Sequence, residues 1–356
     1  MPAEVPKTMA DLFSRASADK PGTKRTDPNA TTLGATDVRR GAVGDIAVTT
    51  TGRILTTHPG DDSVAVLNAR TLAVESIMAV HGEPFAVAVH DDRAYVSTSS
   101  WTHKDEVTII DTTSKAVLAS YPLTENVTAL AVSPDGKRVY AGRTGDGHID
   151  VAVIDVTAER VGTIDVATGA GIGIDALAVD PAGTRLYIAT TDARGSAVVI
   201  VDVETARVEH AVRIGAPIRD IAISGDTGYV LSSDRARGGV LHVVELATGR
   251  ITGIVDLGGA PTQLAVGADK SRAYVVDYDR VVVVCTLTLQ VIDALTVGAR
   301  PSCVTVDSHS GPLYVADYDG HVTAFAVEMT MPLLYSEFMA TDPIVADHRE
   351  LEPVHA

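Results

Sequence analysis

The sequence predicts an all-β fold, a seven-bladed β-propeller with four antiparallel strands in each blade. A tyrosine-centred motif recurs every 40–47 residues, which matches the ~40–45 residues that a four-stranded blade needs. The tyrosines are Tyr95, Tyr140, Tyr187, Tyr229, Tyr274 and Tyr314, and a seventh copy has Ile54. A column of small residues precedes them, namely Ala47, Ala88, Ala131, Ala178, Ala222, Ala265 and Thr305. Seven copies of both features predict seven blades.

Each repeat divides into four short strands by alternation of apolar residues, β-branched residues and turns. The third copy shows this most clearly, with runs at Thr128–Ser133, Arg138–Arg143, Val151–Val156 and Val161–Val166. A short polar residue follows most third strands, where its side chain can bond the backbone two residues on. These turn residues are Asn68, Asp111, Asp155, Asp202 and Glu245.

Composition narrows the possible functions. The chain has 356 residues with 46 acidic and 29 basic side chains, a net charge of −17. This surplus repels phosphate backbones and anionic lipid, so we expect no nucleic-acid partner. No apolar run approaches the ~18 residues of a membrane-spanning helix, so we expect no membrane insertion. The start of the chain shows no secretory signal, which predicts a cytoplasmic protein.

The pattern predicts three regions. Residues 1–42 are expected to form a flexible N-terminal arm, residues 43–339 the propeller, and residues 340–356 an acidic C-terminal tail. A fourth strand for the last blade is assigned near Leu333–Phe338, which closes the ring without exchange of a terminal strand. The alternative is that a segment within Thr31–Val43 pairs with that blade.

Two pairs of segments carry a resemblance to a known family. They are LAVSPDGKRVYAG at 130–142 with VAVIDVTAERVGTIDV at 151–166, and LAVDPAGTRLYIAT at 177–190 with VVIVDVETARV at 198–208. The chain resembles the YVTN-repeat, lactonase-like β-propellers over about residues 43–339. It departs from the repeat at Ile54, which replaces the tyrosine, and at Cys285 and Val327, which replace the turn aspartate. The resemblance implies the seven-bladed fold, and it carries over no catalytic residue.

One rim of the predicted propeller is the candidate binding face. Loops between strands two and three lie there together with the connections from each blade to the next, and these loops vary in length and charge. Long and varied loops on a rigid scaffold are where binding sites concentrate. The candidate ligand-binding residues, at this rim and the mouth of the axial channel, are His81, Glu83, Trp101, His103, Arg143, His148, Asp175, Arg219, Asp220, Gln263 and Arg300.

The sequence contains no catalytic or metal-binding motif at these positions. His103 and His148 lie two residues before Asp105 and Asp150, but HExxH and HxH spacings are absent, and these are typical of metal sites. A P-loop, a strand-to-helix GxGxxG and a GxSxG elbow are also absent. We therefore expect no metal and no cofactor, and assign no catalytic residue. A water-filled channel with structural rim residues is the alternative interpretation.

Two functions remain open. The first is a non-catalytic binding or scaffold module that uses the rim to bind a protein partner or a small polar ligand. The second, implied by the resemblance, is a hydrolase that opens a small sugar lactone at the channel mouth. Glu83, Asp175 or Asp220 would then act as general base, and Arg219 or Arg300 would stabilise the oxyanion. The sequence favours the binding module.

The two cysteines, Cys285 and Cys303, are predicted to remain free thiols. The repeat places them at opposite ends of strands in different blades, and a disulfide needs Cα atoms within about 7 Å. Both should therefore react with a thiol reagent under denaturing, non-reducing conditions. An intramolecular bridge found by mass spectrometry would contradict the assigned strand register.

Overall fold

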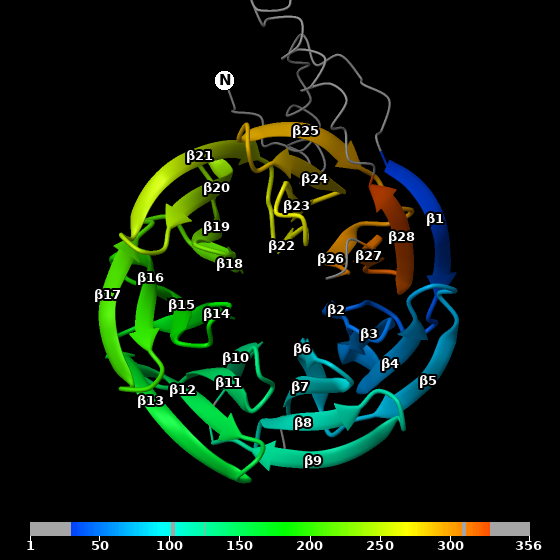
Figure 1. Cartoon of the computed structure of the whole chain (residues 1–356), viewed down its shortest axis with the longest axis horizontal. Helices are drawn as coiled ribbons and strands as arrows, with labels where there is room; N and C mark the ends of the chain where they lie inside the picture. Colours follow the sequence, from blue (N-terminus) through cyan, green and yellow to red (C-terminus); the bar gives the residue numbers. More distant parts are fainter. Residues whose placement is uncertain (1–29, 101–103, 125, 308–310, 328–356) are drawn as a thin grey trace, which may run out of the picture.

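The computed structural model describes residues 30–100, 104–124, 126–307 and 311–327. Over these ranges the strands form seven four-stranded antiparallel sheets, arranged as blades around a central axis (Figure 1). The first strand of each blade lies next to the axis and the last lies at the periphery. The predicted fold class, a seven-bladed all-β propeller, is confirmed.

The first four blades follow the chain in order. Blade one contains β2 (Ile46–Val48), β3 (Arg53–His58), the 3-10 turn η1 (Pro59–Asp61), β4 (Ser63–Asn68) and β5 (Val74–Ala79). Blade two contains β6 (Glu83–His90), β7 (Arg93–Ser99), β8 (Glu106–Asp111) and β9 (Ala116–Pro122). Blade three contains β10 (Asn126–Val132), β11 (Arg138–Thr144), β12 (His148–Asp155) and β13 (Arg160–Thr168). Blade four contains β14 (Gly173–Val179), β15 (Arg185–Asp192), β16 (Gly195–Asp202) and β17 (Arg207–Arg213).

The last three blades complete the ring. Blade five contains β18 (Ile218–Ser224), β19 (Thr227–Asp234), β20 (Gly238–Glu245) and β21 (Arg250–Gly258). Blade six contains β22 (Gln263–Val266), β23 (Arg272–Asp277), β24 (Arg280–Cys285) and β25 (Gln290–Leu295). Blade seven contains β26 (Pro301–Val306), β27 (Leu313–Asp317), β28 (His321–Val327) and β1 (Ala30–Asp37).

Blade seven differs from the expectation, because its outermost strand comes from the other end of the chain. Strand β1 pairs antiparallel with β28, from Ala30 opposite Val327 to Asp37 opposite His321. Figure 1 shows the two strands side by side. The position assigned to Leu333–Phe338 is therefore occupied by β1, and the alternative within Thr31–Val43 identified the pairing region. Its polar, Thr-rich sequence suits an outer strand with one solvated face, but it lacks the repeat motif.

The propeller therefore starts before residue 43. Residues 30–42, assigned to the N-terminal arm, include the closing strand β1 and the buried residues Val38 and Val43. Residues 1–29, Leu333–Phe338 and the tail at 340–356 lie outside the described ranges. For them, the flexible arm and the acidic tail stay predictions.

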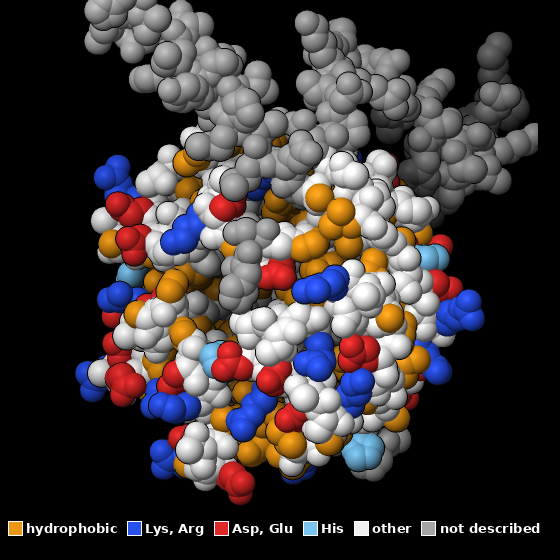
Figure 2. All heavy atoms as spheres, turned by 45° about the vertical axis from the view of Figure 1, so that its right-hand side comes forward, with side chains coloured by type: hydrophobic (Ala, Val, Ile, Leu, Met, Phe, Trp, Pro, Cys, Tyr) orange, Lys and Arg blue, Asp and Glu red, His pale blue; other side chains and the backbone are white. Residues whose placement is uncertain are grey.

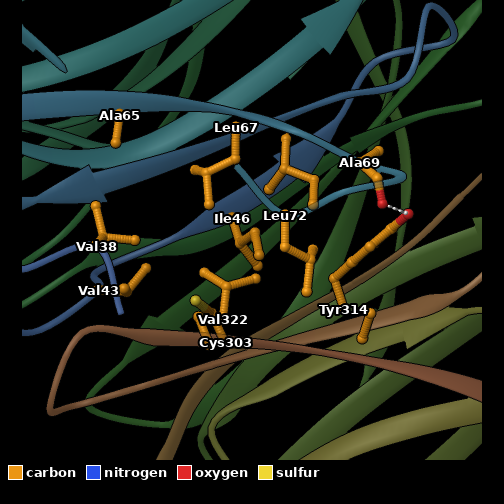
Figure 3. Packing of buried hydrophobic residues seen from close by; sticks show 13 residues of the cluster. Val38, Val43, Ile46, Ala65, Leu67, Ala69, Leu72, Cys303, Tyr314 and Val322 are labelled. Carbon is orange, nitrogen blue, oxygen red and sulfur yellow. Dashed lines mark hydrogen bonds between the residues drawn. The ribbon is translucent and has the colours of Figure 1, made fainter. Parts of the chain in front are cut away.

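The hydrophobic core lies between blades. Seven clusters of buried residues each combine side chains from two neighbouring blades. Figure 3 shows the cluster that joins blade seven to blade one, where Tyr314 packs beside Leu72 and its hydroxyl donates to the Ala69 carbonyl at 3.0 Å. The Tyr95 hydroxyl of blade two donates to the Gly136 carbonyl, in the turn between the first two strands of blade three, at 3.3 Å. Tyr314 and Tyr95 thus each bond a turn of the next blade.

The turns after the third strands contain the side chain to backbone hydrogen bonds that the sequence predicts. Asp111 Oδ1 accepts the backbone N–H groups of Thr113 and Ser114 at 2.9 and 2.7 Å, as in an Asx turn. The residue four places after each turn residue has a positive φ in six blades, although only one of the six is glycine. These residues are Leu72, Lys115, Glu159, Ala206, Gly249 and Leu289. The turn at Cys285 keeps this geometry without an aspartate.

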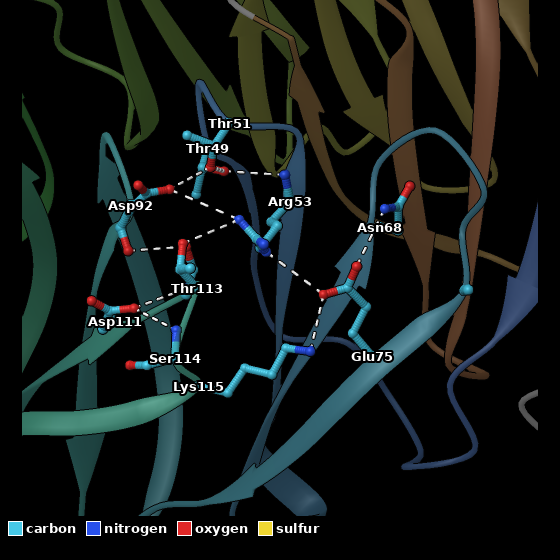
Figure 4. Close-up of polar contacts among 12 residues, drawn as sticks. Thr49, Thr51, Arg53, Asn68, Glu75, Asp92, Asp111, Thr113, Ser114 and Lys115 are labelled. Carbon is cyan, nitrogen blue, oxygen red and sulfur yellow. Dashed lines mark hydrogen bonds and ion pairs between the residues drawn. The ribbon is translucent and has the colours of Figure 1, made fainter.

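Ionic contacts add to the junction between blades one and two (Figure 4). Arg53 Nε of β3 lies 3.6 Å from Glu75 Oε2 of β5, and Lys115 Nζ of blade two lies 3.2 Å from the same oxygen. The Thr51 hydroxyl donates to Asp92 Oδ1 of blade two at 2.6 Å. All these side chains are partly exposed, so each ion pair contributes at most about 1 kcal/mol. Apolar packing dominates this junction.

Deleting residues 1–37 should destabilise the fold, whereas deleting residues 1–29 should not. The longer deletion removes β1, so β28 becomes an unpaired edge and blade seven loses its outer strand. We expect a melting temperature lower by about 10 °C or more for the longer deletion, and within about 2 °C of the full chain for the shorter one. Differential scanning calorimetry measures both. Equal stability of the two variants would contradict closure by β1.

Candidate functional site: the mouth of the axial channel

The innermost strands share a local irregularity at the channel mouth. A β-bulge interrupts the pairing of the first strand with the second in blades two, three, four, five and seven. In blades three, four and five the extra residue is Thr128, Asp175 and Arg219. A bulge leaves one residue unpaired and re-aims its side chain, and bulges are common beside functional sites.

We name the residues three places before the small-residue column the mouth ring. Its members are Gly44, Phe85, Thr128, Asp175, Arg219, Thr262 and Ser302. All except Ser302 are exposed. The seven blades therefore present chemically different side chains at equivalent positions, including one acid, one base and one aromatic ring. Variation at structurally equivalent, exposed positions is the pattern expected of a recognition surface.

Asp175 and Arg219 occupy adjacent positions of the mouth ring in blades four and five. Neighbouring atoms partly desolvate the Asp175 carboxyl group and raise its pKa, although the residue is exposed, while a hydrogen bond from the Thr191 hydroxyl and the positive charge of Arg219 oppose that shift. The two side chains interact electrostatically but form no ion pair within 4.0 Å. In the described part of the chain, the Arg219 guanidinium donates no hydrogen bond to another residue.

Asp220 and Gln263 have a different role, because they link neighbouring blades. Asp220 Oδ2 accepts the N–H of Leu264 in blade six at 2.8 Å, and Asp220 Oδ1 accepts the N–H of Ile221 at 2.8 Å. Gln263 Oε1 accepts the N–H of Val304 in blade seven at 2.7 Å. These hydrogen bonds satisfy backbone groups at strand ends, so both side chains are structural.

Asp45 completes this set and was missed in the sequence analysis. Its Oδ1 accepts the Gln263 amide at 2.8 Å and the N–H of Ile46 at 2.9 Å, and its Oδ2 accepts the N–H of Val87 in blade two at 2.9 Å. Asp45 lies two residues before Ala47, as Asp220 does before Ala222. Aligning the repeats at that column would have identified it. We call Asp45, Asp220 and Gln263 the inter-blade links.

The pKa values of both linking carboxyl groups, Asp45 and Asp220, are raised. Burial raises the pKa of Asp45 to about 6, against hydrogen bonds from Val87, Ile46 and Gln263. Burial also raises the pKa of Asp220 to about 7; hydrogen bonds from Leu264 and Ile221 oppose the shift and the charge of Asp45 adds to it. Two acids in proximity disfavour each other's ionised form. The interior of the mouth therefore changes charge near neutral pH.

Arg300 lies at the same rim, just before β26, in an aromatic stack. Its guanidinium carbon is 4.2 Å from the centre of the Tyr278 ring and 5.3 Å from that of Tyr318. Arg300 Nε also donates to the Tyr278 carbonyl at 3.3 Å. The two tyrosines are exposed by 59% and 48%. An exposed arginine between aromatic rings has the composition of an interaction hot spot.

Three other candidates lie apart from the mouth ring or are already engaged. Arg143 is buried and pairs with both oxygens of Asp150, at 2.6 and 2.8 Å, within blade three. His81 is almost fully exposed, with its Nδ1 3.5 Å from Glu106 Oε1. His81 and Glu106 line a cavity of about 470 Å³ between blades one and two. Glu83 is partly buried at the start of β6.

Three predicted site residues remain, namely His148, Trp101 and His103. His148 is partly buried at the start of β12. Trp101 and His103 lie outside the described residues.

Over the described ranges, no three histidine, cysteine or acidic side chains converge as metal ligands. Over the same ranges, no helix is long and apolar enough to cross a membrane. Both cysteines are free thiols, and burial raises the pKa of Cys303 well above its ordinary value.

Comparison with known proteins identifies the family. No protein-family model matches the chain. A seven-bladed β-propeller protein of Mycolicibacterium smegmatis is 52% identical over 312 residues, which cover 87% of this chain and 84% of that protein. The seven-bladed β-propeller protein Rv1057 of Mycobacterium tuberculosis is 33% identical over 332 residues, which cover 83% and 84%. The chain therefore belongs to the family of seven-bladed β-propeller proteins.

A solved structure shows the same architecture. Hydrazine synthase of Kuenenia stuttgartiensis superposes with a TM-score of 0.70, covering 81% of this chain and 96% of that one. The sequence identity is 18%. At this identity the likeness concerns the fold alone, because one fold hosts many unrelated functions.

Replacing Asp220 with asparagine should reduce the pH dependence of stability. The folded-state pKa is raised from 3.8 to about 7, so protonation favours the folded state. That contribution is complete below about pH 4 and is lost as the pH rises through 7. We expect the fall in unfolding free energy between pH 4 and 8 to shrink by about 1–3 kcal/mol in the variant. Urea unfolding across this range measures it.

The matched control is Asp226→Asn, which removes an exposed carboxylate from the same blade. It should leave the pH profile unchanged. An Asp220→Asn profile that superimposes on that of the unmodified protein would show that Asp220 titrates equally in the folded and unfolded states.

Proposed function

We propose that the protein is a non-catalytic binding module that takes a small polar ligand at the mouth ring. The ligand would carry an anionic group for Arg219 and a hydrogen-bond donor for Asp175. Guanidinium groups bind carboxylate and phosphate through paired hydrogen bonds. The net charge of −17 does not prevent this, because Figure 2 shows acidic and basic side chains mixed on the face it presents.

One observation carries the proposal. The polar side chains at the mouth divide into the inter-blade links, whose acceptors are occupied by backbone and amide groups, and the exposed Asp175–Arg219 pair. A buried acid that already accepts two N–H groups is poorly placed to activate water. A charged pair held apart on two rigid strands is suited to binding, because little order is lost when a ligand bridges it.

A second candidate function is protein binding at the stack of Arg300 with Tyr278 and Tyr318. It is favoured by the exposure of the two rings and by the arginine that lies over both. Lactone hydrolysis, the activity implied by the resemblance to lactonase-like propellers, has less support. Asp220 is engaged between blades. The raised pKa of Asp175 alone does not make it a general base, because its Oδ2 already accepts the Thr191 hydroxyl.

Replacing Arg219 with alanine should weaken ligand binding by about tenfold or more. A hydrogen bond to a charged group contributes about 1.5–3 kcal/mol, and every 1.4 kcal/mol is about tenfold in affinity. The probes are amino acids, hydroxy acids and sugar phosphates, ranked by the rise in melting temperature. Isothermal titration with the best probe then compares the variant with the unmodified protein. The melting temperature should change by less than about 2 °C, because Arg219 is a surface residue.

Arg207→Ala is the matched control, since Arg207 is an exposed arginine on the outer strand of blade four. It should bind the probe as the unmodified protein does. Unchanged affinity in Arg219→Ala would contradict the mouth ring as the ligand site. Loss of probe binding in Tyr278→Ala together with unchanged binding in Arg219→Ala would instead move the site to the aromatic stack.

A further inference from the structure

The rim opposite the channel mouth has a cavity of about 560 Å³ at the junction of blades seven and one. Its floor is apolar, because Leu72 and Tyr314 line it and both are buried. Ala69 and Ala324 add to this floor, and Asn68, Arg70, Thr71 and Asp307 contribute polar groups to the lining. This is the junction at which the ring closes.

An exposed leucine also lines this cavity. Leu33 of β1 is 56% exposed. It lies at a bulge, since the pairing with β28 shifts between Thr32 and Gly34. The bulge leaves Leu33 without a cross-strand partner, beside a cavity with an apolar floor. Covering an exposed leucine is favourable by about 25 cal/mol per Å² of buried apolar surface.

The C-terminal segment 331–339, with the sequence MPLLYSEFM, is a suitable occupant. Seven of these nine residues are apolar or aromatic. The sequence pattern assigned Leu333–Phe338 to the outer strand of blade seven, but β1 occupies that position. Burying its apolar side chains against another apolar surface would be favourable. It begins four residues after Val327, which is paired with Ala30 at the end of the β1–β28 ladder.

Tether length favours this segment over the N-terminal one. Four residues span at most about 13 Å, and Leu33 is three residues from Ala30, the partner of Val327, so only a short tether separates segment 331–339 from the strand that carries Leu33. In the N-terminal segment, Leu12 and Phe13 are separated from Ala30 by more than fifteen residues. A longer tether costs more entropy on closure.

We propose that segment 331–339 docks into the cavity between blades seven and one, with Leu333, Leu334 and Phe338 against Leu33, Leu72 and Tyr314. The docked segment covers the exposed Leu33 above the buried floor and connects the end of β28 to the turns of blade one. It thereby reinforces the ring at its non-covalent junction. This inference is independent of the function proposed for the channel mouth.

Cysteine cross-linking tests the docking directly. The full chain carries Leu33→Cys and Leu334→Cys in a Cys285→Ser background, while buried Cys303 remains. The control pair is Leu118→Cys with Leu334→Cys, because Leu118 of β9 is 51% exposed and lies on the outer strand of blade two. After mild oxidation, peptide mapping by mass spectrometry measures each disulfide. We expect the 33–334 bridge to form at least about fivefold faster than the control, reflecting a higher effective concentration.

Two results would overturn the proposal. Equal rates for the two pairs would show that the segment does not dock at this cavity. A fast bridge between Leu12→Cys and Leu33→Cys, with a slow 33–334 bridge, would assign the cavity to the N-terminal segment. Hydrogen exchange gives a second reading: residues 331–339 should be protected in the unmodified chain and lose protection in Leu33→Asp. Val117→Asp, a comparably exposed control on β9, should leave that protection unchanged.

Discussion

Each blade of this propeller buries its faces only against its two neighbours, so blades one and seven are fully packed only when the ring closes. Seven hydrophobic clusters lie between blades. Six of the junctions join blades that follow one another in the chain. The seventh joins blade seven to blade one, and its outer strand comes from the start of the chain. Closure therefore depends on hydrogen bonds between β1 and β28 and on the packing in Figure 3.

The same constraint shapes the channel mouth. The first strands must be held at a fixed distance from the axis, and Asp45, Asp220 and Gln263 do this by accepting backbone N–H groups from the next blade. Burial in that role raises the pKa of both acids. The mouth ring lies one position earlier on each strand, and bulges single out its members in blades three, four and five. One of them, Thr128, also links blades, because its hydroxyl donates to the Ile174 carbonyl of blade four at 2.8 Å.

The sequence predicted the features that repeat. The tyrosine and alanine columns gave seven blades, because each blade makes the same contacts with its neighbour. Strand β1 carries no repeat motif, and the apolar segment at Leu333–Phe338 offered a local alternative, so closure was assigned to the wrong segment. Asp175 and Arg219, both predicted as ligand-binding residues, are the unpaired residues at the bulges of blades four and five, and their role in binding stays a prediction. Asp175 and Arg219 are exposed, whereas Asp220 links two blades, and this difference depends on a bulge that shifts strand pairing by one residue. The composition of the chain does not indicate such a bulge.

Complementation in trans tests non-covalent closure most directly. A chain lacking residues 1–37 is mixed with a synthetic peptide of residues 30–38, and the melting temperature is followed as the peptide concentration rises. We expect the peptide to restore most of the lost stability in a saturable manner, because binding to the folded state stabilises it by mass action. A peptide with the same residues in scrambled order should have no effect. No recovery with the native peptide, at concentrations that saturate a micromolar site, would contradict closure of the ring by β1.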